Sequence, residues 1–366
     1  MIPVVNLPAQ YHSLKKEIDA AIEEVLREGA FIQGEACRSF ESEFASFCGA
    51  SGACGVGNGS DALFFAVQAL GIGPGDEVIT TPFTFISTAE AISRNGAQPV
   101  FADIDPDTMN LDPGAVKRRL SDKTKAILVV HLYGQPASMD ELGKLARDRD
   151  LKIIEDAAQA HGAEVNGRRV GGLGAVGSFS FYPTKNLSAA GDAGIVVAND
   201  TDLIARVRLL ANHGDQGKYD HALHGVSSRL DNLQAAILRV KLRHLEAWNE
   251  KRRHLAQIYL EELSNLSELR LPREALGCRS VYHQFTVRTK RREALREHLK
   301  ENGIGSVVHY PRPVHLQPAY ASLGLTKGSF PVAEAAAEEV LSLPVYPELG
   351  EDDARYVAKE VRNFFA

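Results

Sequence analysis

The sequence predicts an α/β protein with a mostly parallel central sheet and a smaller C-terminal α+β domain. Short apolar runs alternate with longer segments of helical period through most of residues 1–245, which is the order expected of strands linked by covering helices. The runs are rich in Val, Ile and Phe and mostly lack polar alternation, as strands buried on both faces do. A chain of 366 residues has room for two domains of roughly 150 residues each. We place these domains at residues 1–245 and 246–366.

Strands and helices take turns in the first domain. The first predicted helix should begin at Ser60 or Asp61 and end before Gly71, because polar residues favour helix starts and glycine favours the position past the end. The predicted strands are Glu77–Thr80, Pro99–Asp103, Ala126–His131, Lys152–Glu155, Ser178–Phe181 and Gly194–Ala198. The predicted helices are Asp61–Leu70, Ser87–Asn95, Pro113–Leu120, Met139–Arg149 and Asp202–Asn212.

The pattern changes toward the C-terminus. Apolar residues recur every three or four positions from Leu230 to Val240, which predicts a long helix from about Arg229. This helix should join the two domains. Beyond it we expect a strand, a charged helix and two further helices, at His283–Val287, Arg291–Asn302, Ala333–Leu341 and Asp352–Phe365.

Composition and charge exclude several classes of protein. Lys and Arg number 41 against 47 Asp and Glu, a net charge of −6, which argues against a broad nucleic-acid or acidic-membrane surface. The N-terminus lacks an apolar run behind a basic head, and no stretch approaches the roughly 20 apolar residues of a membrane span. We therefore expect a cytoplasmic protein. The four cysteines lack metal-site spacing, and His221 and His224 have no third ligand nearby, so no metal is predicted.

Residues 172–177, GLGAVG, match the GxGxxG pattern of dinucleotide-binding proteins letter for letter. That pattern must follow a strand and open a helix. Here the glycines follow a polar segment and precede the apolar run at Ser178. We interpret them as a turn.

A second glycine-rich segment, Gly55–Leu70, is more informative. Its glycines precede Ser60 and Asp61 and then a helical pattern. Such a helix start directs unpaired backbone N–H groups and a hydroxyl at whatever is bound there, commonly a phosphate. A capped helix after a tight turn is an equally good interpretation of this segment alone.

Asp156 and Lys185 each follow a predicted strand closely. Ligands of open α/β sheets bind beyond the carboxyl ends of the strands. Asp156 could instead cap the next helix, and a single loop lysine is most often a solvated charge. Together, however, a desolvated lysine and a nearby carboxylate are what a pyridoxal phosphate (PLP) site requires. The lysine forms the Schiff base, and the carboxylate keeps the pyridine nitrogen protonated.

Eight segments in register resemble the DegT/DnrJ/EryC1/StrS family. The likeness runs in order from about Val5 to the C-terminus. It implies the fold type I architecture of PLP-dependent transferases, which is similar to aspartate aminotransferase. Members of the family are mostly PLP-dependent aminotransferases of nucleotide-linked keto-sugars. The segments are GNGSDAL, ITTPFTFISTAEAI, VHLYG, IIEDAAQAHGA, SFYPTKNLSAAGDAG, HGVSSRLDNLQAAI, HYPRPVHLQPAY and LSLPVYPEL.

The resemblance implies a role for several residues. Lys185 matches the Schiff-base lysine, and Asp156 matches the partner of the pyridine nitrogen. Gln159 matches the residue near the cofactor's 3-hydroxyl, and Phe85 matches the aromatic that stacks on the pyridine ring. The phosphate-binding residues that it implies are Gly59, Ser60 and Ser180.

The resemblance also implies a homodimer with shared active sites, in which the loop before Arg229 completes the neighbour's site. The family usually has Asn in this loop, where its amide reaches the partner's phosphate, and this chain has Ser227. A hydroxyl is shorter, and a water could fill the gap. Family members that dehydrate sugars carry His at the lysine position, so Lys185 favours transamination.

The reaction implied is amino transfer from an amino acid, with L-glutamate as the expected donor, to a nucleotide-linked keto-sugar. The substrate-side candidates are Arg229, His309 and Tyr310, with His315 behind them. Arg229 could pair with a diphosphate or carboxylate, or it could be a salt-bridged helix start. His309 and Tyr310 could form no more than a turn.

The segments look most like enzymes that act at C3 of a dTDP-linked 3-keto-6-deoxyhexose. One alternative is a UDP-linked 3-keto uronic acid or C4-keto-sugar aminotransferase. Another is a PLP enzyme acting on a different ketone such as a cyclitol, or catalysing an elimination. A third is a non-catalytic PLP-binding regulator, although such a protein would be expected to lose Lys185, Asp156 or Ser180.

Overall fold

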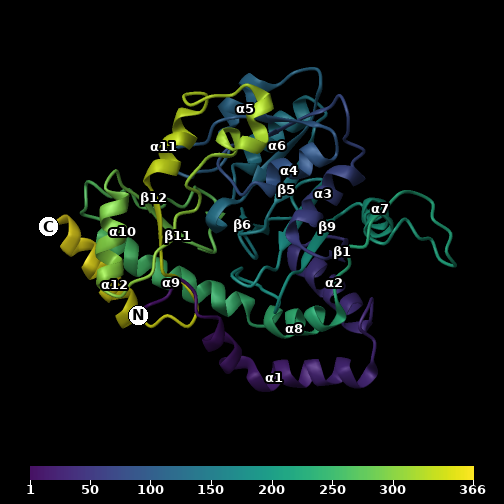
Figure 1. The fold of residues 1–366 in the computed structure, drawn as a ribbon, viewed down its shortest axis with the longest axis horizontal. Coiled ribbons are helices and arrows are strands. Elements are labelled where there is room, and N and C mark those ends of the chain that lie inside the picture. Colours follow the sequence, from purple (N-terminus) through teal and green to yellow (C-terminus); the bar gives the residue numbers. More distant parts are fainter.

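A seven-stranded sheet forms the centre of the computed structural model, which describes residues 1–366 (Figure 1). Its strand order is β1-β9-β8-β5-β4-β2-β3. Strand β9 pairs antiparallel with both β1 and β8, and the other neighbours pair in parallel. The predicted mostly parallel sheet is confirmed. The strands are β1 (Gly52–Val56), β2 (Glu77–Thr80), β3 (Gln98–Phe101), β4 (Thr124–Val130), β5 (Lys152–Asp156), β8 (Val176–Ser180) and β9 (Gly194–Ala198).

Each face of this sheet packs into its own hydrophobic core, because side chains alternate along a strand. In β4, Ile127 and Val129 belong to one core, whereas Ala126 and Leu128 belong to the other. The strands are therefore covered on both faces, as their unalternated sequences predict. The first core packs against α2 (Glu35–Cys48), α5 (Pro113–Arg119), α6 (Met139–Asp148) and α8 (Asn232–Leu242). The second packs against α3 (Gly59–Ala69), α4 (Ser87–Arg94) and α7 (Thr201–Ala211).

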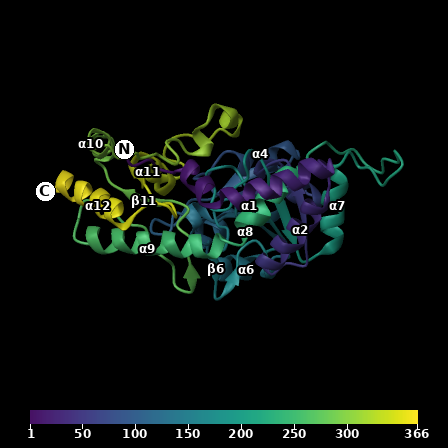
Figure 2. The ribbon, with the colours of Figure 1, turned by 90° about the horizontal axis from the view of Figure 1, so that it is seen from below.

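The N-terminal elements are absent from the sequence prediction. Helices α1 (Leu7–Glu28) and α2 and strand β1 all precede the first predicted element. Helix α1 lies along α8 at the edge of the molecule (Figures 1 and 2). It buries Leu14 and Ile18 against Ile237 and Val240.

The start of α3 differs from the prediction. Asn58, rather than Ser60 or Asp61, caps the helix: its side-chain oxygen accepts a hydrogen bond from the Asp61 amide at 2.9 Å. Asparagine is among the strongest helix caps because its short side chain reaches the first unpaired N–H groups. The hydroxyl of Ser60 is therefore free for another role.

The long helix predicted from Arg229 is two helices. Helix α8 ends at Leu242, and α9 (Leu245–Leu263) begins after a short break. The two pack on different partners, α8 on α1 and α2, and α9 on α12. The break lies close to the predicted boundary between residues 245 and 246, and that division of the chain stays a prediction.

The C-terminal part is built around a two-stranded antiparallel sheet of β11 (Phe285–Arg288) and β12 (Val340–Leu343). The predicted helix Ala333–Leu341 ends earlier, at Glu339, because the chain continues as β12. None of the helices has the length and apolar character needed to cross a membrane. The helices here are α10 (Arg292–Glu301), α11 (Pro331–Glu339) and α12 (Glu351–Phe365). The small strands β6 (Glu164–Val165), β7 (Arg168–Arg169) and β10 (Cys278–Arg279) form a separate sheet.

Candidate active site

A cavity of about 520 Å³ lies at the carboxyl ends of the central strands. Asp156 ends β5 and Ser180 ends β8, and the segments around His283 and His309 line the cavity from the C-terminal part. This is where the ligand of an open α/β sheet is expected. The predicted site residues that line it are Gly59, Ser60, Phe85, Asp156, Gln159, Ser180, Lys185, His309 and Tyr310.

Asp156 is buried at the floor of the cavity. Its carboxylate accepts hydrogen bonds from the Thr88 hydroxyl at 2.8 Å and from the Ala158 amide at 3.2 Å. Burial raises the pKa of Asp156, although these two bonds and the charge of Lys185 act in the opposite direction. A buried carboxylate of this kind is stabilised by a cationic hydrogen-bond donor. Thr88, which holds it, is a site residue that the sequence interpretation missed.

Lys185 extends into the same cavity from the loop after β8. Its backbone amide donates to the Tyr182 carbonyl at 2.8 Å, while the Phe181 amide donates to Ala193 at 2.8 Å, so both ends of the loop are tied down. Removal from solvent lowers the pKa of Lys185 to about 8, and the negative charge of Asp156 opposes this shift. A substantial fraction of the amine is therefore neutral, and nucleophilic, near physiological pH.

The first turn of α3 meets the end of β8 at the opposite wall. Gly59 approaches Ser180 so closely that an added Cβ would lie 2.5 Å from the Ser180 Cβ. The amides of Gly59 and Ser60 are at the helix start and have no helical acceptor. The Ser60 hydroxyl bonds with Ser87 at 2.7 Å. This corner has the N–H groups and hydroxyls that hold a phosphate at a helix N-terminus.

Gln159 and Tyr310 are joined across the cavity. The Gln159 side chain accepts a hydrogen bond from the Tyr133 amide at 2.7 Å and donates one to the Tyr310 hydroxyl at 3.0 Å. The exposed ring of Phe85 lies 6.1 Å from that of Tyr310. The Tyr133 hydroxyl donates to the His309 carbonyl. Residues near the central sheet and residues of the C-terminal part thus form one hydrogen-bonded wall of the cavity.

Two predicted residues, Ser227 and Arg229, lie outside this cavity. The Arg229 guanidinium donates to Asn212 at 3.2 Å and to the Ser227 hydroxyl at 2.9 Å. Both belong to the chain between α7 and α8, which extends away from the body of the molecule (Figures 1 and 2). Within one chain they do not reach Lys185.

His315, which the sequence interpretation places behind Arg229, His309 and Tyr310, lies outside the cavity. Its ring is buried, pairs with Glu334 at 3.1 Å and meets the edge of Phe330 at 4.8 Å between centroids. It does not line the cavity. The surrounding apolar residues make it part of a packed core.

The glycine segment at residues 172–177 leads into β8, which begins at Val176, and opens no helix, as predicted. Its amides converge on Glu155, a fully buried carboxylate that the sequence interpretation missed. Glu155 accepts from the Gly171 amide at 2.7 Å and the Leu173 amide at 2.8 Å, and it pairs with His131 at 3.1 Å. The turn therefore anchors β5 next to Asp156.

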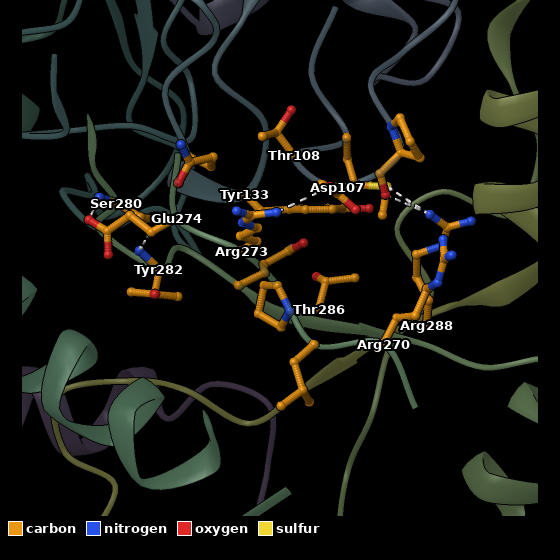
Figure 3. Close-up of a pocket in the computed structure, with 16 residues that line it drawn as sticks. Asp107, Thr108, Tyr133, Arg270, Arg273, Glu274, Ser280, Tyr282, Thr286 and Arg288 are labelled. Atoms are coloured by element: carbon orange, nitrogen blue, oxygen red, sulfur yellow. Dashed lines mark hydrogen bonds and ion pairs between the residues drawn. The ribbon is translucent and has the colours of Figure 1, made fainter. Parts of the chain in front are cut away.

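A second, smaller cavity of about 220 Å³ lies behind Tyr133 (Figure 3). Most of its charges are paired within the protein. Arg288 pairs with Glu339 at 2.9 Å, and Arg273 lies 3.5 Å from Asp107. It contains no lysine. The chemistry therefore belongs to the first cavity.

The first cavity fits PLP on three counts. The Lys185 amine has no hydrogen-bond partner and opens to the cavity. The buried Asp156 carboxylate needs the cationic donor that a pyridinium N–H supplies. The start of α3 offers a phosphate site. No group of three or more His, Cys, Asp or Glu side chains that could hold a metal is present.

A sequence profile of the DegT/DnrJ/EryC1/StrS aminotransferase family matches residues 12–362. The chain belongs to this family. The predictions of family, fold class, aminotransferase activity and PLP as cofactor are thereby confirmed.

Relatives in this family carry different names. A "pleiotropic regulatory protein" of Geobacillus stearothermophilus is 48% identical over 100% of this chain and 98% of its own length. The dTDP-3-amino-3,4,6-trideoxy-alpha-D-glucose transaminase of Streptomyces venezuelae is 48% identical over 99% and 96%. The UDP-2-acetamido-2-deoxy-3-oxo-D-glucuronate aminotransferase of Pseudomonas aeruginosa is 41% identical over 99% and 100%.

The crystal structure of S. venezuelae DesV in complex with a ketimine intermediate superposes with a TM-score of 0.97. It is 48% identical, and the match covers 99% of this chain and 98% of that chain. The two chains share one fold over nearly their whole length.

Proposed function

We propose that this aminotransferase moves an amino group from an amino acid, with L-glutamate as the expected donor, to C3 of a dTDP-linked 3-keto-6-deoxyhexose. The observation that carries the reaction class is the pair of titratable groups that line one cavity, Lys185 with its lowered pKa and Asp156 with its raised one. The dTDP-sugar is supported by the S. venezuelae transaminase, which is 48% identical.

When bound, PLP supplies an electron sink for the carbanion that forms at the reacting carbon. Asp156 would hold the proton of the pyridine nitrogen, and the first turn of α3 would hold the phosphate. The neutral Lys185 amine would take a proton from the donor's α-carbon as a general base and return it as a general acid. Gln159 and Phe85 would position the ring.

We extend the proposal to a homodimer with shared active sites. The loop that carries Ser227 and Arg229 extends away from its own chain (Figure 1). Its exposed Tyr219 and Val226 fit a contact with a second copy, where the Ser227 hydroxyl would lie near the phosphate and Arg229 near a substrate anion.

Mixed dimers test this arrangement. Lys185→Ala and Arg229→Ala chains, each inactive alone, should regain activity when mixed, because some of the hybrid sites carry neither change. Hybrids that stay inactive, while each variant alone forms the normal oligomer, would contradict shared sites.

The reaction is tested in two steps. Purified protein with added PLP should show a visible absorbance band that depends on Lys185 and fades when L-glutamate is added. A dTDP-linked 3-keto-6-deoxyhexose should then restore the band and appear as an amino sugar by mass spectrometry. If no band forms with PLP, the aminotransferase proposal fails at its first step.

Two alternatives remain as outcomes of the same test. Restoration by a UDP-linked 3-keto sugar alone would place the substrate with that of the P. aeruginosa relative. A PLP band without turnover on any keto-sugar would favour a regulator, the class that the name of the G. stearothermophilus relative suggests.

A further inference from the structure

His283 lines the active-site cavity, and the sequence interpretation gives it no role. It stands two residues before the start of β11, and it is 7% exposed. Arg252, a buried residue of α9, donates to the His283 carbonyl at 3.3 Å and to the Val345 carbonyl at 2.6 Å. The backbone at His283 is therefore clamped between two segments of the C-terminal part.

A chain of hydrogen bonds fixes which nitrogen of the His283 ring carries the proton. The chain begins at the His161 carbonyl, which can only accept, so the Asn249 amide donates to it, at 2.8 Å. The Asn249 oxygen must then accept from Asn186, at 2.9 Å. Asn186 also donates to the Val281 carbonyl at 3.1 Å. Both donors of Asn186 are thus used, and its oxygen remains for the ring.

That oxygen lies 3.0 Å from His283 Nδ1, so Nδ1 carries the hydrogen. Burial lowers the pKa of His283 well below its ordinary value, and the positive charges of Lys185 and Arg252 lower it further. The ring is neutral, and Nε2 has a free lone pair. His283 Nε2 has no hydrogen-bond partner in the protein and opens to the cavity.

The other histidine of the cavity differs in this respect. His309 meets the Gln284 amide through Nε2 at 3.3 Å and the Ser342 hydroxyl through Nδ1 at 3.4 Å. Both of its nitrogens have partners in the protein. His283 is therefore the histidine that offers an unused acceptor to the cavity.

We propose that His283 is a positioning residue for the active-site lysine, whose protonated amine donates a hydrogen bond to His283 Nε2. The proposal rests on the role assigned above to Lys185. That role makes the amine a transient ammonium in a buried place, and such an ion needs a hydrogen-bond acceptor. With PLP bound, the Asp156 carboxylate would accept from the pyridine nitrogen, and the titratable groups His161 and His309 carry no charge to offer. Without PLP, the charge of Asp156 favours the ammonium equally in the wild type and in each variant tested.

The test follows the protonation of Lys185 in the full chain without cofactor. Acetic anhydride would be applied over a range of pH, and modification of Lys185 would be read by peptide mass spectrometry. The wild-type midpoint should lie near pH 8. His283→Leu should move it about one pH unit lower, because the ammonium loses a hydrogen bond. Lys241, a second lysine whose pKa is lowered to about 8 by burial, is an internal reference that should not move.

Two conservative variants separate positioning from general damage. The side-chain oxygen of His283→Gln reaches close to the former Nε2, so this variant should restore the wild-type midpoint. His283→Asn keeps only the Nδ1 end and should behave like His283→Leu. Asn186→Leu should also lower the midpoint, because the His283 ring is then no longer held with its proton on Nδ1. Asn186 does not line the cavity itself.

An unchanged midpoint in His283→Leu would overturn the proposal. If that variant fails to fold, the comparison of His283→Gln with His283→Asn replaces it. Equal midpoints in these two variants would overturn the proposal. The measurement uses no cofactor and no substrate. The proposal for His283 can therefore be refuted while the PLP band forms normally. It can also be confirmed in a protein that turns over no sugar.

Discussion

The two neighbouring cavities differ in what their charges are bonded to. The second cavity holds more charge, with Arg270, Arg273, Arg288, Asp107 and Glu274 along its walls (Figure 3). Most of these groups are neutralised by the protein itself, and Glu274, for example, pairs with Arg253 at 2.9 Å. The active-site cavity holds one lysine and few carboxylates, yet the pKa values of Lys185 and Asp156 are shifted in opposite directions.

The comparison shows that the pairing and the pKa shift of charged groups indicate a reactive site better than the number of such groups does. A paired arginine at a surface cavity stabilises the fold or contributes nothing. A half-buried lysine without a hydrogen-bond partner lowers stability, and such a group persists where binding of a ligand or substrate compensates for the loss.

The largest effect should come from Lys185→Ala. It removes the base that moves the proton, so the transamination rate should fall at least about 1,000-fold, and no lysine-dependent PLP band should form. Lys241→Met is the matched control, since burial lowers the pKa of that lysine to about 8 as well, but its amine donates to Ser188 at 3.2 Å outside the cavity. Loss of the band in the control would refute the distinction.

The next largest effect should come from changing Asp156, one of two adjacent carboxylates on β5. Asp156→Asn should lower the rate about 100- to 1,000-fold, because the pyridine nitrogen loses its charged partner. Burial raises the pKa of Asp156, so this carboxyl destabilises the cofactor-free protein increasingly as the pH rises from its ordinary pKa to the raised one, and fully above the raised one. The Asn variant should therefore melt higher at pH 7, and this gain should vanish below about pH 4, where the carboxyl is protonated in both states.

Glu155→Gln should lower stability and leave the PLP band in place, the reverse of what we expect for Asp156→Asn. Its carboxylate accepts from the Gly171 and Leu173 amides and from His131, so the variant should lose about 1–3 kcal/mol of unfolding free energy in urea. Its PLP band should still form at low temperature. If Glu155→Gln abolishes the band and leaves stability unchanged, the two carboxylates have been assigned the wrong way round.

The pH dependence of cofactor loading should be a smaller effect. Only the neutral amine of Lys185 attacks, so the rate of band formation should rise with pH and level off above about pH 8, the lowered pKa of this group. An ordinary lysine would give a midpoint near about 10.4. Stopped-flow absorbance at constant ionic strength would measure it. A midpoint near the ordinary value would mean that water reaches the amine.

The sequence predicted the parts of the molecule that depend on local pattern. Apolar runs and their ends predict three features: the order of the strands in the sequence, the burial of both sheet faces, and the positions of Asp156 at the end of its strand and Lys185 after its strand. The resemblance supplied Gly59, Phe85 and Gln159, which line the same cavity.

Contacts between distant segments could not be predicted in this way. Thr88 and Asp156 are 68 residues apart, and His283 and Asn186 are 97 apart; no periodicity connects them. His315 is a further case, because its place in the sequence does not reveal that its ring packs on Phe330. Whether a polar side chain enters a cavity or a core depends on tertiary packing, and a single sequence does not encode that in its spacing.

The smallest effect should come from Arg270→Ala in the second cavity. Arg270 is exposed, and its side chain makes no hydrogen bond or ion pair, so stability and kcat/KM should stay within about threefold of wild type. The cavity nevertheless touches the active site, because Tyr133 lines it and bonds the His309 carbonyl. If a substrate phosphate lay there, the variant would lose a charged hydrogen bond and kcat/KM would fall about 10- to 100-fold. Steady-state kinetics with the preferred sugar nucleotide therefore decides whether the second cavity is only structural.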